Sequence, residues 1–157
     1  MTPLIRAATP ADVPLILQFI RELAEYERLA AEVTADETAL HRTLFGEHPA
    51  AGCLLAFVDQ TPAGFAVYFT NYSTFLARPG IYLEDLFVRP ACRGQGIGKA
   101  LLLHLARLAH ARGCGRMEWS VLDWNESAIA FYEGLGAKRL TDWTICRLDR
   151  AALARLA

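Results

Sequence analysis

The sequence lacks features that would place it in several large classes of protein. Lys and Arg total 16 against 17 Asp and Glu, so the net charge is −1 and there is no basic excess of the kind that attracts nucleic acid or anionic lipid. No apolar run reaches the roughly 18 residues of a membrane span. Residues 1–6 do not show the charged-then-apolar order of a signal peptide. We therefore expect a cytoplasmic protein with neither nucleic acid nor a membrane as a partner.

Paired cysteines, repeats and linkers are missing as well. The four cysteines form no C-x-x-C pair, and none of the four histidines lies at a metal-ligand spacing from two of them, so we expect reduced thiols and no metal site. No low-complexity stretch divides the chain. The 157 residues, 54% of them hydrophobic, are enough for one buried core. Residues 1–157 are thus expected to form a single domain.

Hydrophobic periodicity and turn residues predict strands and helices in alternation. The order β-α-α-β-β-β-α-β-α-β favours a mixed α/β sheet with helices on both faces. The expected strands are Leu4–Ala7, Gly52–Val58, Gly64–Phe69, Ile81–Val88, Arg116–Leu122 and Trp143–Leu148. The expected helices begin at caps Thr9, Thr34 and Asn125 and at Gly96, and end near Glu27, Leu44, Glu133 and Arg112, with a turn or two over Asp149–Leu156.

A glycine-rich turn between a strand and a helix carries the most informative pattern. Glycines allow the backbone to approach a ligand, and the free N–H groups of a helix start attract phosphate oxygens, so this turn predicts a diphosphate site. It is not a P-loop, because Lys99 is followed by Ala100. It is not a dinucleotide fingerprint, because Lys99 stands where the third glycine would be. A turn that only joins strand to helix explains one glycine more easily than three at alternate positions.

The segment Arg93–Gly98, with the sequence RGQGIG, resembles the acetyl-CoA signature of the GNAT superfamily of N-acetyltransferases. That resemblance implies a GNAT fold, with a central and mainly antiparallel mixed sheet flanked by helices, over nearly the whole chain. A narrower resemblance is to the spermidine/spermine N-acetyltransferase family, which includes diamine and thialysine acetyltransferases. It rests on four separated matches in the right order: Arg21–Glu27, Phe45–Pro49, Tyr82–Asp85, and Trp124–Glu126 with Phe131–Tyr132.

The resemblance implies acetyl-CoA as co-substrate and assigns residues to it. Backbone groups of Leu86, Phe87 and Val88 would meet the pantetheine arm and the thioester carbonyl, where an unpaired N–H could stabilise an oxyanion. The diphosphate would be bound by the backbone of Gly94, Gln95, Gly96, Ile97, Gly98 and Lys99, with Arg93 supplying positive charge. Asn125, Glu126 and Ser127 would also touch coenzyme A, which is compatible with Asn125 being a plain helix cap.

Two side chains are implied to be catalytic. Tyr132 would be the general acid that protonates the departing thiolate; the alternative is an ordinary packed aromatic. An amine substrate arrives protonated, and Glu84 would accept that proton directly or through water. Glu84 and Asp85 are adjacent on a strand, so we expect their side chains on opposite faces and only one of them in a given cleft. A solvated carboxylate is the alternative for each.

The substrate is expected to be a cation. Residues 22–37 hold six acids against one base, although a solvated helix face is the usual explanation of such a run. By resemblance, Tyr26, Glu27 and Glu84 contact the amine, and Glu118, Trp119 and Ser120 line the other wall. One departure from the family pattern is the absence of a basic side chain just after Tyr132, where some relatives have cations near coenzyme A. This departure would either weaken cofactor binding or leave the contact with coenzyme A to Lys138 or Arg139.

The expected function is acetylation of a small cationic amine, such as a polyamine, diamine or thialysine, by direct attack in a ternary complex. Acetylation of a protein lysine, an N-terminus or an antibiotic amine is the alternative within this chemistry, and a non-catalytic acyl-CoA sensor is the alternative outside it. The resemblance also implies a homodimer, in some relatives formed by exchange of C-terminal strands.

Overall fold

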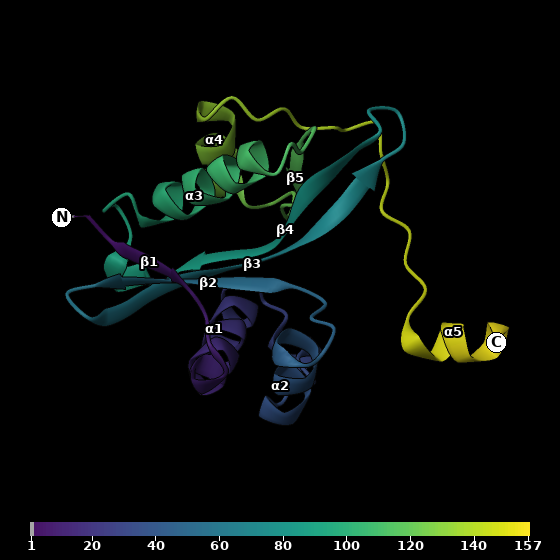
Figure 1. Ribbon diagram of the computed structural model, residues 1–157, viewed down its shortest axis with the longest axis horizontal. Coiled ribbons are helices and arrows are strands. Elements are labelled where there is room, and N and C mark those ends of the chain that lie inside the picture. Colours follow the sequence, from purple (N-terminus) through teal and green to yellow (C-terminus); the bar gives the residue numbers. More distant parts are fainter. Residues whose placement is uncertain (1) are drawn as a thin grey trace. The chain divides into compact units, whose positions relative to one another are not determined.

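A computed structural model describes residues 2–157, which fall into two compact units, residues 2–120 and residues 121–157. The first unit contains a five-stranded sheet in the order β1-β2-β3-β4-β5. Neighbouring strands are antiparallel from β1 to β4, and β5 runs parallel to β4 (Figure 1). The mixed, mainly antiparallel sheet expected from the sequence is confirmed. The strands are β1 Leu4–Ala7, β2 Gly52–Val58, β3 Thr61–Ser73, β4 Arg78–Val88 and β5 Met117–Trp119.

The two long central strands, β3 and β4, extend further than the sequence predicts. The β2–β3 turn contains only Asp59 and Gln60, both with positive φ (48° and 66°), as a tight hairpin turn requires. The loop expected over residues 73–80 shrinks to residues 74–77, because Pro79 and Gly80 pair with β3. Gly80 fits this strand since a Cβ there would lie 2.5 Å from Oδ1 of Asn71. Pro79 and Gly80 are therefore among the first residues of β4 and do not belong to the loop.

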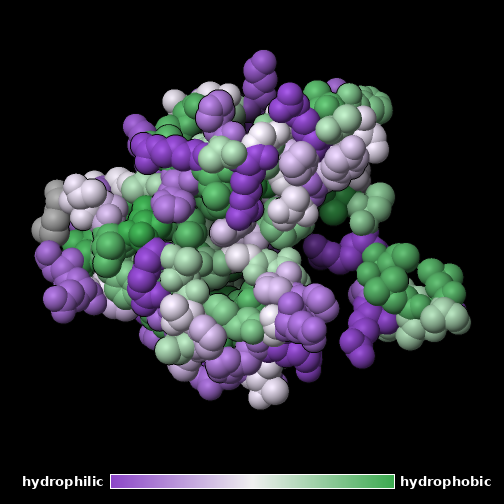
Figure 2. All heavy atoms as spheres, viewed as in Figure 1, coloured by the Kyte–Doolittle hydropathy of each residue, from purple (hydrophilic) through white to green (hydrophobic). Residues whose placement is uncertain are grey.

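Helices cover both faces of this sheet, as expected. Helices α1 (Val13–Tyr26) and α2 (Glu37–Phe45) lie on one face, and α3 (Ile97–Ala111) lies on the other (Figure 1). The α1 face is packed around Phe19, which stacks on Phe65 with ring centroids 5.2 Å apart. The α3 face is packed around Leu101 and Leu105, which are fully buried. Hydrophilic side chains gather over the outer side of α1 and α2 (Figure 2).

Short 3₁₀ turns and caps set where the helices begin. Turns η1 (Pro10–Asp12) and η3 (Pro90–Cys92) precede α1 and α3, and η2 (Ala30–Glu32) follows α1. The cap of α2 is Asp36, whose Oδ1 accepts a hydrogen bond from the Ala39 N–H at 2.8 Å. The expected cap, Thr34, is therefore wrong. Asp36 has the extended backbone that an N-cap needs and lies one residue before the helix.

Residues 121–157 contain helices α4 (Glu126–Gly134) and α5 (Arg150–Leu156), both at expected positions. The strand expected over Arg116–Leu122 shortens to β5, and the strand expected over Trp143–Leu148 is not formed. Trp143 and Ile145 are 80% and 71% exposed. Alternating apolar residues can form a strand only beside another strand, and no strand of the described chain pairs with this segment. In residues 2–157 no helix is long and apolar enough to cross a bilayer.

Candidate active site

Strand β4 loses one of its two neighbours halfway along its length. The register of β5 covers only Ile81 to Leu83, so within residues 2–157 the part of β4 from Asp85 to Val88 pairs with β3 alone. The Arg89 N–H donates to the carbonyl of Ala63, a residue of β3, at 2.8 Å. Successive residues of a strand direct their N–H and C=O groups alternately to its two sides. Phe87, two residues before Arg89, therefore directs its backbone groups toward β3, whereas Leu86 and Val88 direct theirs toward the open edge. This edge therefore offers backbone N–H groups to a ligand.

The three residues expected to contact a thioester thus have different roles. Leu86 and Val88 present main-chain groups at the open edge, although the Val88 carbonyl already accepts a hydrogen bond from Nε of Arg93 at 2.9 Å. The backbone of Phe87 faces β3, and its side chain is buried in the core beneath α1. An N–H at an open strand edge can stabilise negative charge that develops on a carbonyl oxygen.

The glycine-rich turn ends in a helix start with free donors. Gly94 and Gly96 both have φ of 78°, a conformation that favours glycine, and a Cβ at either position would meet nothing within 4 Å. Gly96 caps α3, and among residues 2–157 no side chain makes a capping hydrogen bond to the first turn, which leaves the N–H groups of Ile97, Gly98 and Lys99 available. Buried Ile97 anchors this end of the helix in the core. These donors, the helix dipole and the open space above the turn fit a phosphate group.

A β-bulge in β4 changes the direction of one carboxylate. Val67 of β3 pairs with Asp85, and the next residue, Tyr68, pairs with Leu83, so Glu84 is an extra residue in the ladder. Leu83 and Leu86 both face the α3 core. Alternation forward from Leu83 places Glu84 on the α1 face, and alternation back from Leu86 places Asp85 on that same face. The expectation that the two side chains leave opposite faces is therefore wrong.

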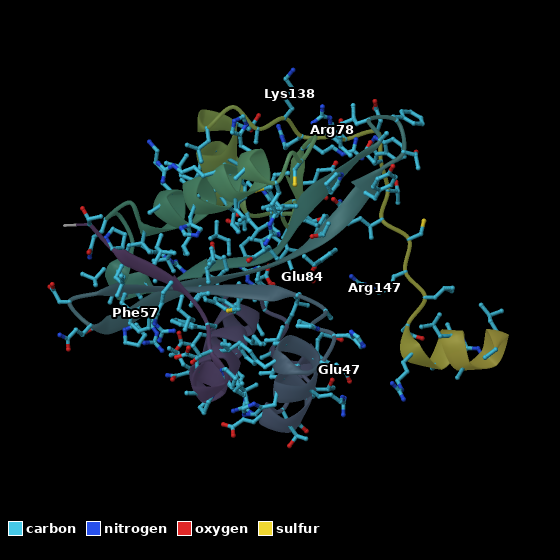
Figure 3. The ribbon with its side chains drawn as sticks, viewed as in Figure 1. Glu47, Phe57, Arg78, Glu84, Lys138 and Arg147 are labelled. Atoms are coloured by element: carbon cyan, nitrogen blue, oxygen red, sulfur yellow. The ribbon has the colours of Figure 1, made fainter. Side chains whose placement is uncertain are left out.

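Three carboxylates gather on this face. Burial raises the pKa of Asp85 to about 7, and the negative charges of Glu84 and Glu27 add to that shift. Burial also raises the pKa of Glu27, which follows the last residue of α1, with a further contribution from Glu84. Glu84 lies at the middle of the sheet, away from the Phe57 end of β2 (Figure 3). Concentrated negative charge at this place favours a cationic ligand.

An open pocket of about 620 Å³ lies between α1 and the segment that connects β4 to α3. Arg89 crosses its base, donating to both carboxylate oxygens of Glu22 at 3.0 and 3.1 Å while its guanidinium lies 4.7 Å from the ring of Phe19. Arg93 forms the second connection, with its guanidinium 4.7 Å from the ring of Tyr26. The pocket is lined by Glu22, Glu25, Tyr26, Phe87, Arg89, Pro90, Ala91 and Arg93.

The residues expected on the second wall have separate environments. Glu118 pairs with Arg116 at 3.1 Å. The Ser120 hydroxyl lies 2.8 Å from the hydroxyl of Tyr82, which connects the end of β5 to β4. Trp119 packs against the core beneath α3, and so is directed to the other face from the carboxylates. Of these three residues, Ser120 has the clearest polar contact with β4.

The remaining expected residues lie in the second unit, on or beside α4. Asn125 caps this helix, its Oδ1 accepting from the Ala128 N–H at 3.4 Å and from the Ser127 hydroxyl at 3.4 Å. Glu126 is the first residue of the helix, and Tyr132 follows about two turns later beside Phe131, with ring centroids 5.4 Å apart. Of the two basic residues considered near Tyr132, Arg139 is paired with Glu133 at 3.7 Å. One short helix thus carries all four expected residues of this unit.

Sequence reasoning did not identify Arg89, Glu22 or the bulge. In the acidic run of residues 22–37, Glu22 holds Arg89 and Asp36 caps α2, so two of the six acids serve the fold. Glu22 and Tyr26 are four residues apart on α1, as are Arg89 and Arg93 beyond β4, a spacing that could have suggested paired contacts. Within residues 2–157 no group of three or more His, Cys, Asp or Glu is arranged to hold a metal ion.

Comparison with known proteins agrees with this geometry. The model of the acetyltransferase (GNAT) family matches residues 16–137. A thialysine N-epsilon-acetyltransferase of Bos taurus is 41% identical, covering 98% of this chain and 96% of its own length. An L-ornithine N5-acetyltransferase of Arabidopsis thaliana is 34% identical over 95% of this chain and 85% of its own length. An integron cassette protein of V. cholerae has a solved structure that superposes with a TM-score of 0.82 at 28% identity, covering 99% of this chain and 98% of that one.

An open strand edge beside a glycine-rich helix start, on a mixed sheet that is otherwise antiparallel, defines an acyl-thioester acetyltransferase fold. The chain belongs to the GNAT family and is an N-acetyltransferase, which confirms the resemblance identified from the sequence. Acetyl-CoA is the co-substrate of this family. The relatives support acetyl transfer to an amine.

Proposed function

We propose that this enzyme transfers the acetyl group of acetyl-CoA to the primary amine of a small cationic substrate: a diamine, a polyamine, or an amino acid with a side-chain amine such as thialysine or ornithine. The observation that carries the proposal is the gathering of Glu84 and Asp85 of β4 with Glu27, which follows α1, next to the edge where Leu86 and Val88 present main-chain N–H groups. The names of the relatives, a thialysine and an ornithine acetyltransferase, support the same substrate class.

One group of residues binds the acetyl donor, acetyl-CoA, and another binds the acceptor amine. The amides of residues 94–99, with Arg93 nearby, hold the diphosphate, and Asn125, Glu126 and Ser127 make further contacts with coenzyme A. Main-chain groups of residues 86–88 orient the thioester. Tyr26 and Glu27 bind the substrate cation, with Glu118 and Ser120 on the opposite wall.

Proton transfer completes the proposed reaction. A lysine-like amine has a pKa of about 10.4 and is protonated near neutral pH, so Glu84 accepts a proton, directly or through water, before the nitrogen attacks the carbonyl carbon. A new C–N bond then forms, the C–S bond breaks in the ternary complex, and the phenol of Tyr132 donates its proton to the thiolate that leaves. The nitrogen loses its second proton in the same step, and this proton restores the Tyr132 phenol through solvent. We propose that both units act as one acetyltransferase domain; the family match runs across their boundary at residue 120.

Incubation of the protein with acetyl-CoA and single amines, read as release of free thiol, tests the function. We expect thialysine, ornithine, lysine, putrescine or spermidine to give release that depends on the protein, and an equal concentration of the same amine acetylated on every nitrogen to give none. Aminoglycosides and lysine peptides in the same assay test the alternative substrates. Absence of release with every amine, while calorimetry still detects coenzyme A binding, would instead favour an acyl-CoA sensor.

We also propose that the enzyme is a cytoplasmic homodimer. The four free cysteines fit a reducing compartment. Residues 141–148, which form neither helix nor strand, carry the exposed apolar side chains Trp143, Ile145 and Leu148, and a strand of a second copy would cover them. Light scattering is expected to give the mass of two chains, twice 17.4 kDa, at micromolar concentration. A mass of one chain would contradict the dimer.

A further inference from the structure

An aromatic pair lies on the sheet beside the three carboxylates. Phe69 of β3 and Tyr82 of β4 are paired in register, and their ring centroids are 5.1 Å apart with the ring planes inclined at 30°. Val67, two residues before Phe69, packs in the core beneath α1, so alternation along β3 places Phe69 on the α1 face. Tyr82 lies directly opposite and shares that face. The two rings are therefore on the face where the carboxylates gather.

Neither ring is part of a hydrophobic core. In the described part of the chain, the side chains that form or pack against the two cores do not include Phe69 or Tyr82, and both are only half-buried. The pairing of β2 with β3 ends at Tyr68, so no residue of β2 lies beside Phe69. The core beneath α1 thus ends at the pair formed by Val67 and Asp85, and the aromatic pair follows it along the sheet.

Tyr82 is held from both neighbouring strands. On the β3 side its ring lies against Phe69, and on the β5 side its hydroxyl lies 2.8 Å from the hydroxyl of Ser120. Glu118 is paired with Tyr82 in the register of β5. Since Trp119 packs in the core beneath α3, its neighbours Glu118 and Ser120 are directed to the face of Tyr82. Tyr82 therefore borders both the carboxylates and the opposite wall of the acceptor site.

An aromatic ring next to concentrated negative charge is suited to a cation that carries a hydrocarbon chain. The face of the ring attracts an ammonium group within about 6 Å of its centre, and its apolar surface packs against methylene groups. Tyr82 and Glu84 are two residues apart on β4, a separation of about 6.6 Å along a strand. That separation is comparable with the distance between the two nitrogens of extended putrescine. An amine at Glu84 thus places the rest of the acceptor over Tyr82.

We propose that Tyr82 is a specificity-determining residue, whose ring binds the ammonium group of the acceptor that does not react while the reacting amine reaches Glu84. Phe69 is a positioning residue that supports this ring. The inference rests on the proposed function and adds to it the residues that recognise the remote end of the acceptor. The Tyr82 hydroxyl orients the ring through Ser120 and is not itself the group that attracts the cation.

Pairs of amines that differ in the remote ammonium group test the proposal. Putrescine is compared with n-pentylamine, which has a methyl group in its place, and ornithine with 5-aminopentanoate, which lacks the α-ammonium group. The pair whose dication is the better acceptor is used. The quantity measured is the ratio of kcat/KM for the dication to kcat/KM for its analogue. Where turnover of the analogue is too slow to follow, its competitive inhibition constant replaces it in the ratio.

Tyr82→Leu, which keeps an apolar side chain but removes the ring, is expected to lower this ratio about 5-fold, through KM for the dication rather than through kcat. Tyr82→Phe keeps the ring and should change the ratio by less than about 2-fold. Phe69→Leu, a second variant that does not alter Tyr82 itself, should lower the ratio about 2-fold. Tyr72→Leu is the matched control, because Tyr72 is 63% exposed on the opposite face of β3, and it should leave the ratio unchanged.

The ratio distinguishes recognition of the cation from general damage to the fold, which would lower kcat/KM for both amines in proportion. Proportional loss in Tyr82→Leu, or no loss, would overturn the inference and leave the proposed function intact. If Tyr82→Leu does not fold, an unchanged ratio in Phe69→Leu has the same meaning. Equal losses of the ratio in Tyr82→Phe and Tyr82→Leu would assign the effect to the hydroxyl and also overturn it. Failure of the wild type to acetylate any amine would contradict the proposed function itself.

Discussion

Tyr132→Phe is expected to lower kcat about 100-fold or more, because a general acid commonly contributes a factor of 10² to 10⁴ to the rate. The reference pKa values of a phenol, about 10, and of a thiol, about 8.5, are close enough for a tyrosine to transfer its proton to a departing thiolate. The phenylalanine ring keeps the contact with Phe131, so the fold of α4 should be preserved. Steady-state kinetics with thiol detection measures the effect.

The affinity for coenzyme A shows whether Tyr132→Phe removes only the proton donor or also damages the cofactor-binding site. Calorimetry is expected to give the same Kd for Tyr132→Phe as for the wild type, since the hydroxyl acts on the leaving group rather than on the diphosphate. Tyr72→Phe is the matched control, because Tyr72 is 63% exposed on β3 and the same hydroxyl is removed. A Tyr132→Phe enzyme with unchanged kcat would mean that Tyr132 is a packing aromatic and that another group protonates the thiolate.

The glycine-rich turn could be predicted from sequence because its determinants are local. Gly94 and Gly96 have the positive φ that glycine favours, and the helix begins at the next residue, Ile97. The cap of α4 at Asn125 is equally local. The cap of α2 was predicted wrongly because Thr34 and Asp36 are both good capping residues, and only the extended backbone at Asp36 decides between them. Rules based on local sequence identify possible capping residues but do not determine which of two nearby residues caps the helix.

The bulge at Glu84 could not be predicted in the same way. It exists because Val67 and Tyr68 of β3 pair with Asp85 and Leu83 of β4, and that register depends on the packing of both strands against the two cores. Strict alternation, the only rule available from one strand, assigns the wrong face to one carboxylate. The grouping of the acidic residues at the candidate site therefore became apparent only in the three-dimensional structure.

Contacts between distant segments were hidden for a similar reason. Arg89 and Glu22 are separated by 67 positions in the sequence, and nothing near either residue indicates the other. In the segment Trp143–Leu148, by contrast, the sequence predicts a strand that the structure does not contain. Its apolar alternation predicts a strand, but a strand also needs a neighbour, which a pattern in one segment cannot supply. Sequence periodicity indicates which secondary structure a segment can form, and the presence of a neighbouring strand determines whether a predicted strand forms.

Asp85→Asn is expected to stabilise the protein above neutral pH. The folded pKa of Asp85, about 7, is higher than that of an aspartate in an unfolded chain, about 3.8. Below pH 4 both states are protonated and the group costs nothing. As the pH rises from about 4 to 7, the unfolded chain releases this proton while the folded protein retains it, so the free energy of unfolding falls by about 1.4 kcal/mol per pH unit. Above pH 7 the cost levels off at about 4 kcal/mol.

Asparagine has nearly the same shape and no charge to desolvate, so the variant avoids this cost. At pH 8 its Tm should exceed that of the wild type by about 10 °C, and at pH 4 the two should coincide. The groups that face Asp85 do not alter the sign. Glu84 of β4 and the Glu27 carboxylate are like charges, and burial raises the pKa of Cys53 on β2 to about 12, which keeps this thiol neutral. Thermal unfolding at both pH values, with Asp142→Asn as an exposed control, measures the difference.

We propose that this destabilising carboxylate serves the reaction through its neighbour Glu84. When Asp85 carries a proton near neutral pH, one negative charge next to Glu84 is removed, and in the proposed reaction Glu84 accepts the proton of the amine. Asp85→Asn should therefore preserve kcat/KM at pH 6 and remove the part of its pH dependence that follows ionisation of Asp85. A variant with no gain in Tm at pH 8 would show that this carboxylate is solvated, and would remove the basis for coupling between the two acids.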